Sequence, residues 1–252
     1  MEHSPDSIIY PDFSFYQPLK GYRITIDTVI LYRFAAAHAA GTVLEAGSAS
    51  GVMSILLSRN RKVARVTGIE TDPEAYGLSL RNRELNGCGD RVEFVHDDLK
   101  YYKRLFKPQS FDTIVTNPPF HKAGTGKVSN EQGIASAHHE HSLTLEVLFA
   151  SLRYLLKPGG YCMVLFPCSR LDELLSQTKG LAVEVLRFIH RKHDRPADAV
   201  LMLAKKGRGK QLSIVPPLYV QDTDGYSKEV QDMLDPRDEE DPGSSAADKN
   251  TP

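Results

Sequence analysis

The chain has 252 residues, of which 41% are hydrophobic and 25% charged, and its formal net charge is −1. This composition is typical of a globular protein with a buried core and excludes collagen-like and largely disordered chains. The apolar runs are shorter than a bilayer span, the N-terminus lacks a signal-peptide pattern and the three cysteines form no CxxC pair, so we expect a cytoplasmic protein without a membrane partner, disulfide framework or zinc site.

Apolar runs of strand length alternate with helical periodicity from about residue 27 to residue 205, which is typical of a wound α/β sheet. The predicted helices span 27–37, with Asp27 or Thr28 as the cap, 52–58, 73–86 and 144–156. The predicted strands span 42–45, 63–70, 92–95, 111–116, 161–166, 182–189 and 199–204. We therefore expect a Rossmann-like α/β fold with helices on both faces, in which the final hairpin adds one antiparallel strand at the sheet edge.

The charges are divided unevenly along the chain. Residues 222–252 contain ten acidic and three basic residues, a net charge of −7, and the other 28 basic and 22 acidic residues give +6. We expect residues 1–234 to form one domain and residues 235–252, which lack apolar periodicity, to form an acidic disordered tail. Basic residues cluster in four segments, at 59–65, 100–107, 187–195 and 205–210. A positive domain suits a polyanionic partner larger than a mononucleotide.

Four predicted strands end in polar or glycine residues. Ligands bind outside the carboxyl ends of the strands in an open α/β sheet, so these ends should line one crevice. The first end is Glu45 with the turn Ala46–Gly51, where Ala49 and Val52 replace the glycines of a dinucleotide fingerprint. An acid there suits an ammonium or sulfonium group, and the backbone N–H groups of the turn can hold a carboxylate. The pattern indicates a nucleoside that carries an amino acid.

Acids also follow the next two strands. Glu70 ends the second strand and is placed to accept hydrogen bonds from ribose hydroxyls, as the acid after the second strand does in dinucleotide folds. Asp97 and Asp98 follow the third strand, and Asp98 is placed to accept from an adenine amino group. A simple tight turn at Gly47 and a helix-cap neighbour at Glu70 remain the structural alternatives.

The fourth strand end is the most specific signal, because Asn117-Pro118-Pro119-Phe120 follows an apolar strand. Prolines lack N–H donors and fix φ, which biases this segment toward presenting acceptors. The Asn117 oxygen and the Pro118 carbonyl can hold the two N–H bonds of an exocyclic amine while Phe120 stacks on the base. Catalysis of this kind depends mainly on positioning. The alternative is a proline turn with a buried phenylalanine.

These motifs resemble the bacterial tRNA1(Val) adenine-37 N6-methyltransferases, which are class I S-adenosylmethionine-dependent enzymes with an Asn-Pro-Pro-aromatic motif. The resemblance covers residues 15–234. It is carried by Gln17-Pro18, Gly21-Tyr22-Arg23-Ile24, Asp27, Glu45 to Gly51, Asn117 to Phe120, Lys122-Ala123-Gly124, Ala137, His139-Glu140, Asp194-Arg195-Pro196-Ala197, Pro216-Pro217-Leu218, Tyr226-Ser227 and Glu229-Val230.

The resemblance implies a seven-stranded sheet and direct methyl transfer from S-adenosylmethionine to the N6 amine of an adenine in tRNA or another structured RNA, by a monomer. It implies a cofactor site formed by Asp27, Glu45, Gly47, Gly51, Glu70, Asp97, Asp98 and Asn117. It implies that Asn117, Pro118, Pro119 and Phe120 are catalytic. Three positions depart from the family pattern: Ala49 replaces the middle glycine of the turn, Glu45 the commoner Asp, and His138 a basic residue.

Other functions remain open. The same motif serves guanine N2 methylation of ribosomal RNA and glutamine-amide methylation of release factors, and a cofactor-binding module without turnover is a non-enzymatic alternative. We expect no metal at His138, His139 and His141, because only the first and third share a helix face and no second cluster supplies ligands. We expect His139-Glu140 to brace the loop of the active site instead.

Overall fold

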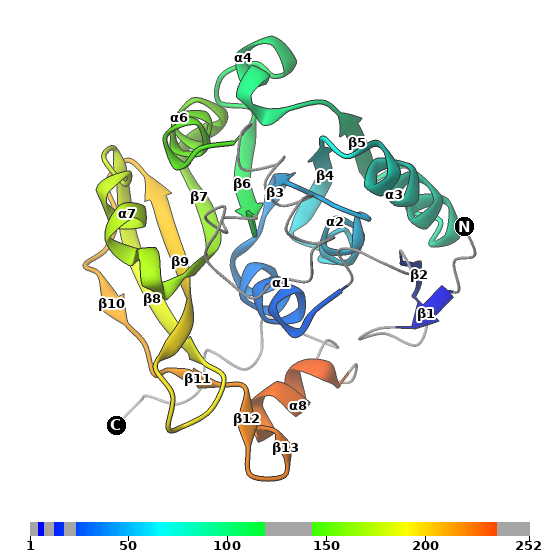
Figure 1. Cartoon of the computed structure of the whole chain (residues 1–252). Helices are drawn as coiled ribbons and strands as arrows, with labels where there is room; N and C mark the ends of the chain where they lie inside the picture. The colour runs from blue at the N-terminus through cyan, green and yellow to red at the C-terminus, as the bar shows by residue number, and fades with distance from the viewer. Residues whose placement is uncertain (1–4, 8–12, 18–23, 119–142, 236–252) are drawn as a thin grey trace, which may run out of the picture.

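Nine strands pair into one mostly parallel sheet, in the order β10-β8-β9-β7-β6-β3-β4-β5 with β11 also paired to β8 (Figure 1). This computed structural model describes residues 5–7, 13–17, 24–118 and 143–235. The strands are β1 (Pro5–Ser7), β2 (Ser14–Tyr16), β3 (Gly41–Ala46), β4 (Val63–Glu70), β5 (Val92–His96), β6 (Phe111–Thr116), β7 (Leu156–Pro167), β8 (Leu181–His190), β9 (Ala197–Lys206), β10 (Ser213–Ile214), β11 (Leu218–Tyr219), β12 (Gln221–Asp222) and β13 (Gly225–Tyr226). The helices are α1 (Ile26–His38), α2 (Val52–Leu57), α3 (Pro73–Leu85), α4 (Tyr102–Leu105), α6 (Leu145–Leu155), α7 (Leu171–Ser176) and α8 (Lys228–Leu234), with short 3-10 turns η1 (Leu99–Tyr101) and η2 (Cys168–Arg170).

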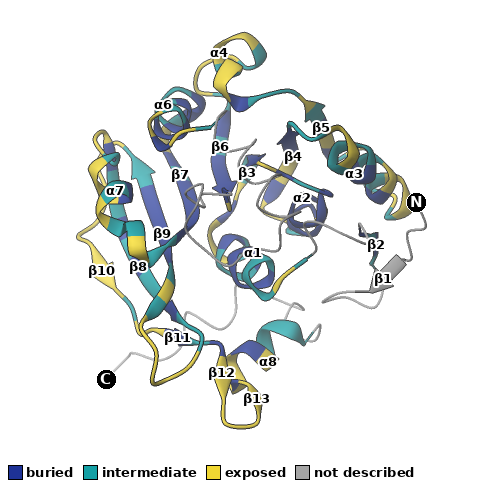
Figure 2. Ribbon diagram, in the orientation of Figure 1, coloured by how far each residue is buried: buried dark blue, intermediate teal, exposed yellow. Residues whose placement is uncertain are grey.

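Helices cover both faces of the sheet, because successive strand residues point to opposite sides. Val43 and Met163 belong to a core shared with α1, α2, α3 and α8, whereas their neighbours Leu44 and Val164 belong to a second core under α4, α6 and α7. Figure 2 shows the sheet strands as largely buried between these two layers. The predicted α/β fold with helices on both faces is confirmed.

Two details of the predicted sheet need correction. Its seven long strands are joined by the short strands β10 and β11, and the antiparallel strand β9 lies between β7 and β8 rather than at the edge. The reason is burial. Residues 200–204 of β9 are apolar and all buried, whereas buried residues in β8 alternate with half-buried ones. A strand that is apolar on both faces belongs inside a sheet, and the alternating strand lies outside it.

The first helix starts earlier than predicted. Thr25 occupies the N-cap position of α1, and Asp27 lies in the first helical turn. Asp27 is therefore not the cap, and its carboxylate accepts two hydrogen bonds from Arg191, at 2.8 and 2.9 Å. An acid in the first turn still favours the helix dipole.

The predicted tail, apart from Asp235, lies outside the described residues, as does the loop 122–136. Within the described ranges no helix is both long and apolar enough to cross a bilayer.

Candidate active site

The carboxyl ends of four neighbouring strands meet at one edge of the sheet. Ala46 at the end of β3 is paired in register with Thr116 of β6 on one side and Ile69 of β4 on the other. Glu70, the next residue of β4, is paired with His96 at the end of β5. Strand order reverses between β3 and β6, which is where α/β sheets bind ligands. The structure therefore brings together the four strand ends that the sequence analysis selected.

Thr116 closes the junction between β3 and β6. Its buried hydroxyl donates to the carbonyl oxygen of Ala46 at 2.8 Å. The next residue on each strand, Gly47 on β3 and Asn117 on β6, therefore leaves the sheet beside the other. Asn117 is exposed and Pro118 is buried, so the asparagine side chain is accessible while the proline anchors the backbone behind it.

The glycine-rich turn is held in a conformation that favours glycine. Gly47, Ala49 and Gly51 have φ values of +78°, +46° and +80°. A side chain at Gly51 would also collide with the ring of Phe94. Ala49 is an L residue in the left-handed region, which costs roughly 1–2 kcal/mol. Its N–H donates to Glu70 Oε2 at 2.8 Å, and this bond fixes the turn to the end of β4.

Glu45 is a buried carboxyl group, with a relative exposure of 3%. The hydroxyl of Ser54 donates to its Oε2 atom. Burial raises the pKa of Glu45 to about 8, although the hydrogen bonds from Ser54 lower it. No lysine, arginine or histidine among the described residues forms an ion pair with it. A buried acid without a cation partner is a good receptor for a cationic ligand group.

Glu70 is also buried, at 8% exposure. Its Oε1 atom accepts from the N–H groups of Thr71 and Asp72, at 2.8 and 2.9 Å, and its Oε2 atom accepts from Ala49. Each carboxylate oxygen has two acceptor positions, so one position remains on Oε2. A ligand hydroxyl can occupy that position.

Asp97 and Asp98 already have partners within the chain. Arg104 donates to both carboxylate oxygens of Asp97, at 2.7 and 3.0 Å. Asp98 caps η1 by accepting from Lys100 N at 2.9 Å, and its Oδ2 lies 2.9 Å from Lys100 Nζ. The hydrogen bond that the Lys100 ammonium donates to Asp98, followed by the negative charge of Asp98, raises the pKa of Lys100.

The remaining predicted site residues are separated from this group or undescribed. Asp27 lies at the start of α1 and faces Arg191, as described above. Pro119 and Phe120 lie outside the described residues. The histidines at 138, 139 and 141 lie outside them as well, and no group of three potential metal ligands occurs in the described part of the chain.

The turn leaves one polar group unsatisfied. The Oγ atom of Ser48 is buried and has no hydrogen-bond partner among the described residues. Beside it, Gly47 is exposed, with open space where a side chain would stand. Buried polar groups are rarely left unpaired in proteins. A turn with an unpaired hydroxyl and open space fits a site that a polar ligand completes.

Three supporting residues were missed by the sequence analysis: Thr116, Ser54 and Asn82. Asn82 is fully buried in α3, and its amide donates to the carbonyl oxygen of Ser50 in the turn at 2.8 Å. Its Oδ1 atom accepts from the N–H of Tyr16 in β2 at 2.7 Å. Asn82 thus joins the turn to the N-terminal strand. Its only signal in the sequence is an asparagine within a helix, where that residue is disfavoured.

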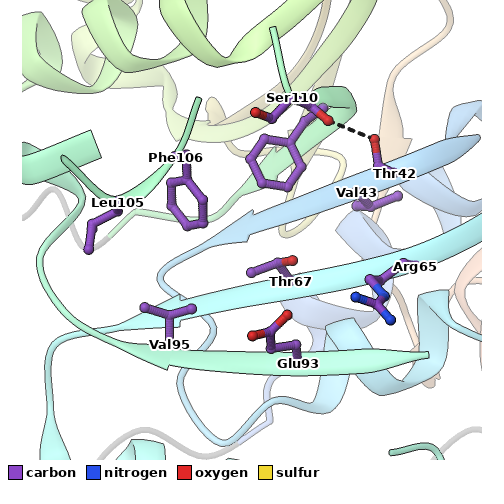
Figure 3. A pocket seen from close by; sticks show the side chains of 10 residues that line it. Thr42, Val43, Arg65, Thr67, Glu93, Val95, Leu105, Phe106 and Ser110 are labelled. Atoms are coloured by element: carbon purple, nitrogen blue, oxygen red, sulfur yellow. Dashed lines mark hydrogen bonds between the residues drawn. The ribbon is translucent and has the colours of Figure 1, made fainter. Parts of the chain in front are cut away.

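A separate hollow lies on the face of the sheet that α4 partly covers (Figure 3). It has a volume of about 380 Å³ and is lined by Thr42, Val43, Arg65, Thr67, Glu93, Val95, Leu105, Phe106, Ser110 and Phe111. It forms because α4 is a single turn, four residues long, and leaves part of the sheet uncovered. Glu45, Glu70 and Asn117 do not line it, so it is separate from the residues gathered at the strand ends.

The strand order and the turn at the end of the first parallel strand define a class I methyltransferase fold. A predicted O-methyltransferase from Agrobacterium tumefaciens has a similar structure, with a TM-score of 0.64 and 19% identity over 82% of this chain and 95% of that protein. M. jannaschii TYW2, solved in complex with AdoMet, is similar with a TM-score of 0.53 and 15% identity over 81% of this chain and 84% of that protein.

Sequence comparison assigns the family. The methyltransferase small domain matches residues 23–165. A tRNA1(Val) (adenine(37)-N6)-methyltransferase from Porphyromonas gingivalis is 31% identical over 67% of this chain and 68% of the relative, and one from Dyadobacter fermentans is 27% identical over 86% and 90%. The chain belongs to the methyltransferase small domain family and, within it, to the tRNA1(Val) (adenine(37)-N6)-methyltransferases. The predicted family and enzyme class are confirmed.

Proposed function

We propose that this enzyme transfers a methyl group from S-adenosylmethionine to the exocyclic N6 amine of adenine 37 in tRNA1(Val). The observation that carries the proposal is the register of β3 and β6. Ala46 is paired with Thr116, so Asn117 emerges directly beside the turn that starts at Gly47. An acceptor for the target amine thus stands next to the part of the site that suits the cofactor.

The residues at the strand ends fit S-adenosylmethionine. The buried Glu45, which has no cation partner in the described structure, suits the ammonium group, and the open acceptor on Glu70 suits a ribose hydroxyl. The unpaired hydroxyl of Ser48 lies in the turn between them. Asp98 and Asp97, one strand further along the sheet, would flank the adenine. Gly47 and Gly51 keep the turn open, and Asp27 supports the site through Arg191.

The cofactor supplies an electrophilic methyl group on its sulfonium sulfur. The chain positions the nucleophile: Asn117 and the carbonyl of Pro118 hold the N–H bonds of the amine, while Pro119 stiffens the backbone and Phe120 stacks on the base. An adenine must leave its stack to reach this position, and single-stranded loops allow this. The proton is released to water after attack. We propose a cytoplasmic, monomeric enzyme that needs no metal.

The test is incubation of the purified protein with labelled S-adenosylmethionine and, separately, total tRNA, ribosomal RNA or release factor. We expect label only in tRNA, and mass spectrometry of its nucleosides should identify N6-methyladenosine. Label in N2-methylguanosine of ribosomal RNA, or on protein alone, would contradict the proposal and support one of the two alternatives. Transcripts of tRNA1(Val) with adenine 37 replaced by guanine test the position.

A further inference from the structure

The fold divides the four basic segments of the sequence between opposite edges of the sheet. Segment 205–210 ends and follows β9, where Lys205 is paired with Tyr161 of β7 and Tyr161 with Thr113 near the start of β6. Segment 59–65 precedes and begins β4. Both therefore lie at the amino edge, away from Asn117. Segments 100–107 and 187–195 instead follow or end strands β5 and β8 at the carboxyl edge, where the active site lies.

The basic residues of these last two segments differ in their pairing. Lys100 and Arg104 form ion pairs with Asp98 and Asp97. Lys103 and Lys107 form none within the described ranges, but they belong to the stretch that leads back to the start of β6 at the amino edge. In the turn between β8 and β9, Lys192 and Arg195 are exposed. No carboxylate within the described ranges forms an ion pair with either of them. The β8–β9 turn therefore presents two cations without ion pairs, with the exposed carboxylate of Asp194 between them, at the same edge as the site.

The β8–β9 turn is fixed by its neighbours, although it is exposed (Figure 2). Arg191 donates to Asp27 of α1 at 2.8 and 2.9 Å, and its own N–H donates to Asp198 at 3.0 Å. His193 stacks on Tyr219 of β11 with ring centroids 3.9 Å apart, and its Nε2 lies 2.9 Å from Asp222. The turn thus contacts four elements, α1, β9, β11 and β12.

Hydrogen bonds within the turn involve the main-chain atoms of the two exposed basic residues, Lys192 and Arg195. His190 Nδ1 lies 2.8 Å from the carbonyl oxygen of Arg195, and the N–H of Arg195 donates to the carbonyl oxygen of Lys192 at 3.3 Å. The side chains of Lys192 and Arg195 take no part in these contacts. A fixed backbone that carries two unpaired cations loses little conformational entropy when it binds an anion.

We propose that this turn, residues 190–195, binds the phosphate backbone of the RNA substrate a few nucleotides from the methylated one. The inference rests on the proposed function and names the surface that the substrate uses. In sheet order, β7 and β9 separate β6 from β8. The pairings of Thr116 with Val164, Val164 with Met202 and Met202 with Leu186 put His190 four residues beyond the level of Thr116. With strands about 4.8 Å apart and about 3.3 Å per residue, the turn stands roughly 20 Å from Asn117. Phosphates a few nucleotides away from one held at Asn117 are within reach over that span. Positive charge of this kind gives salt-dependent binding without base specificity.

The experiment compares two double variants with equal changes in charge. Lys192→Glu with Arg195→Glu alters the β8–β9 turn, and Arg208→Glu with Lys210→Glu alters an exposed segment at the amino edge. RNA affinity is measured by fluorescence anisotropy of a labelled tRNA1(Val) transcript at several salt concentrations. We expect the first variant to bind about 10–100-fold more weakly at low salt, with a salt slope reduced by about 1–2. The second variant should stay within about twofold of the unaltered protein.

Two further measurements separate this surface from the rest of the enzyme. The affinity for S-adenosylhomocysteine and the kcat at saturating RNA should be unchanged in the Lys192→Glu, Arg195→Glu variant, while KM for RNA rises. The milder pair Lys192→Gln and Arg195→Gln should give an intermediate loss, which guards against a folding defect. Unchanged RNA affinity in the glutamate variant, or equal losses in both double variants, would overturn the proposal. If the unaltered protein methylates no RNA, the proposed function itself fails.

Discussion

Two carboxyl groups on adjacent strands differ in their burial and in their partners. Glu45 lies near the end of β3 and Asp112 near the start of β6. Glu45 is buried with Ser54 as its partner, and burial raises its pKa to about 8. Burial also acts on Asp112, but hydrogen bonds from Lys157 and Thr42 outweigh it and lower the pKa of that group. Lys157 Nζ lies 2.7 Å from Asp112 Oδ2, and Thr42 donates its N–H to the same oxygen at 2.8 Å.

The contrast extends to the two edges of the sheet. At the amino edge the polar groups around Asp112 are paired. At the carboxyl edge, among the described residues, Glu45 has no cation partner and Ser48 Oγ has no hydrogen-bond partner. Unsatisfied buried groups cost stability and are most often explained by a functional role. The amino edge thus stabilises this fold, whereas the carboxyl edge retains unsatisfied groups of the kind expected where a ligand binds.

The largest effect should come from Asn117, the residue nearest to the proposed chemistry. Asn117→Ala removes the acceptor that orients the target amine, and loss of positioning of this size lowers kcat about 100-fold or more. Cofactor affinity should change little, because the turn from Gly47 to Gly51 is untouched. Single-turnover methylation measures the rate of methyl transfer, and calorimetric titration with S-adenosylhomocysteine measures the cofactor affinity.

Gln211→Ala is the control for Asn117→Ala, since it removes another exposed amide that precedes β10 and lies outside the site. Gln211→Ala should leave both the methylation rate and the cofactor affinity unchanged. Loss of cofactor binding in Asn117→Ala, with kcat at saturating cofactor preserved, would show that Asn117 serves the cofactor and not the base.

The second prediction concerns the charge of Glu45 and the affinity for S-adenosylmethionine. The ammonium group requires the ionised carboxylate, but with a pKa of about 8 Glu45 is mostly protonated at lower pH. Affinity should therefore rise about tenfold per pH unit from about pH 6 to about pH 7.5, where the α-amino group stays largely protonated. Glu45→Gln should bind about tenfold or more weakly at the upper end and show a nearly flat profile. An equally steep profile in the variant would rule out Glu45 as the titrating group.

A feature of the fold or of the candidate site was predictable where neighbouring residues in the sequence determine it. The turn at Gly47 and the motif at Asn117 could be predicted because acids, glycines and prolines at strand ends have few other roles. The position of β9 inside the sheet also has a local signal in the sequence. The uninterrupted apolar run from Val200 to Ala204 indicates a strand buried on both faces. The contacts of Asn82 and the pair of Asp27 with Arg191 were not readable. They join positions 66 and 164 residues apart, and only the tertiary fold determines such partners.

The third prediction concerns stability and compares the two carboxyl groups directly. The folded-state pKa of Glu45 lies above its unfolded value of 4.5, so the unfolded state releases its proton first and stability falls as pH rises from about 4.5 to about 8. Glu45→Gln should therefore be more stable than the unaltered protein above pH 8, by an amount on the order of a few kcal/mol, and similar to it near pH 4.

Asp112→Asn should behave in the opposite way. The folded-state pKa of Asp112 is lowered, so its contribution to stability is present above its unfolded value and is lost as pH falls. The variant should therefore be less stable than the unaltered protein at neutral pH, and the difference should shrink in acid. Urea unfolding at several pH values measures both variants. A Glu45→Gln variant that is destabilised at pH 8 would contradict the contrast between the two edges.

The smallest expected effect concerns the two non-glycine residues with positive φ among the described residues, Ala49 at +46° and Gln109 at +56°. Ala49 lies in the turn of the site, and Gln109 lies before β6, at the amino edge. Replacement by glycine removes the left-handed strain at each position but adds backbone entropy to the unfolded chain. Ala49→Gly and Gln109→Gly should each raise the free energy of unfolding by about 0.5–1 kcal/mol.

The two variants should differ in function. The methyl group of Ala49 stands where the family usually has glycine, so Ala49→Gly should tighten S-adenosylhomocysteine binding a few-fold, whereas Gln109→Gly should leave it unchanged. Calorimetric titration of both variants decides the point. If Ala49→Gly gains stability but not affinity, its methyl group strains only the backbone and does not crowd the cofactor. Equal affinity changes in both variants would show that the effect comes from overall stability, because Gln109 is remote from the ligand.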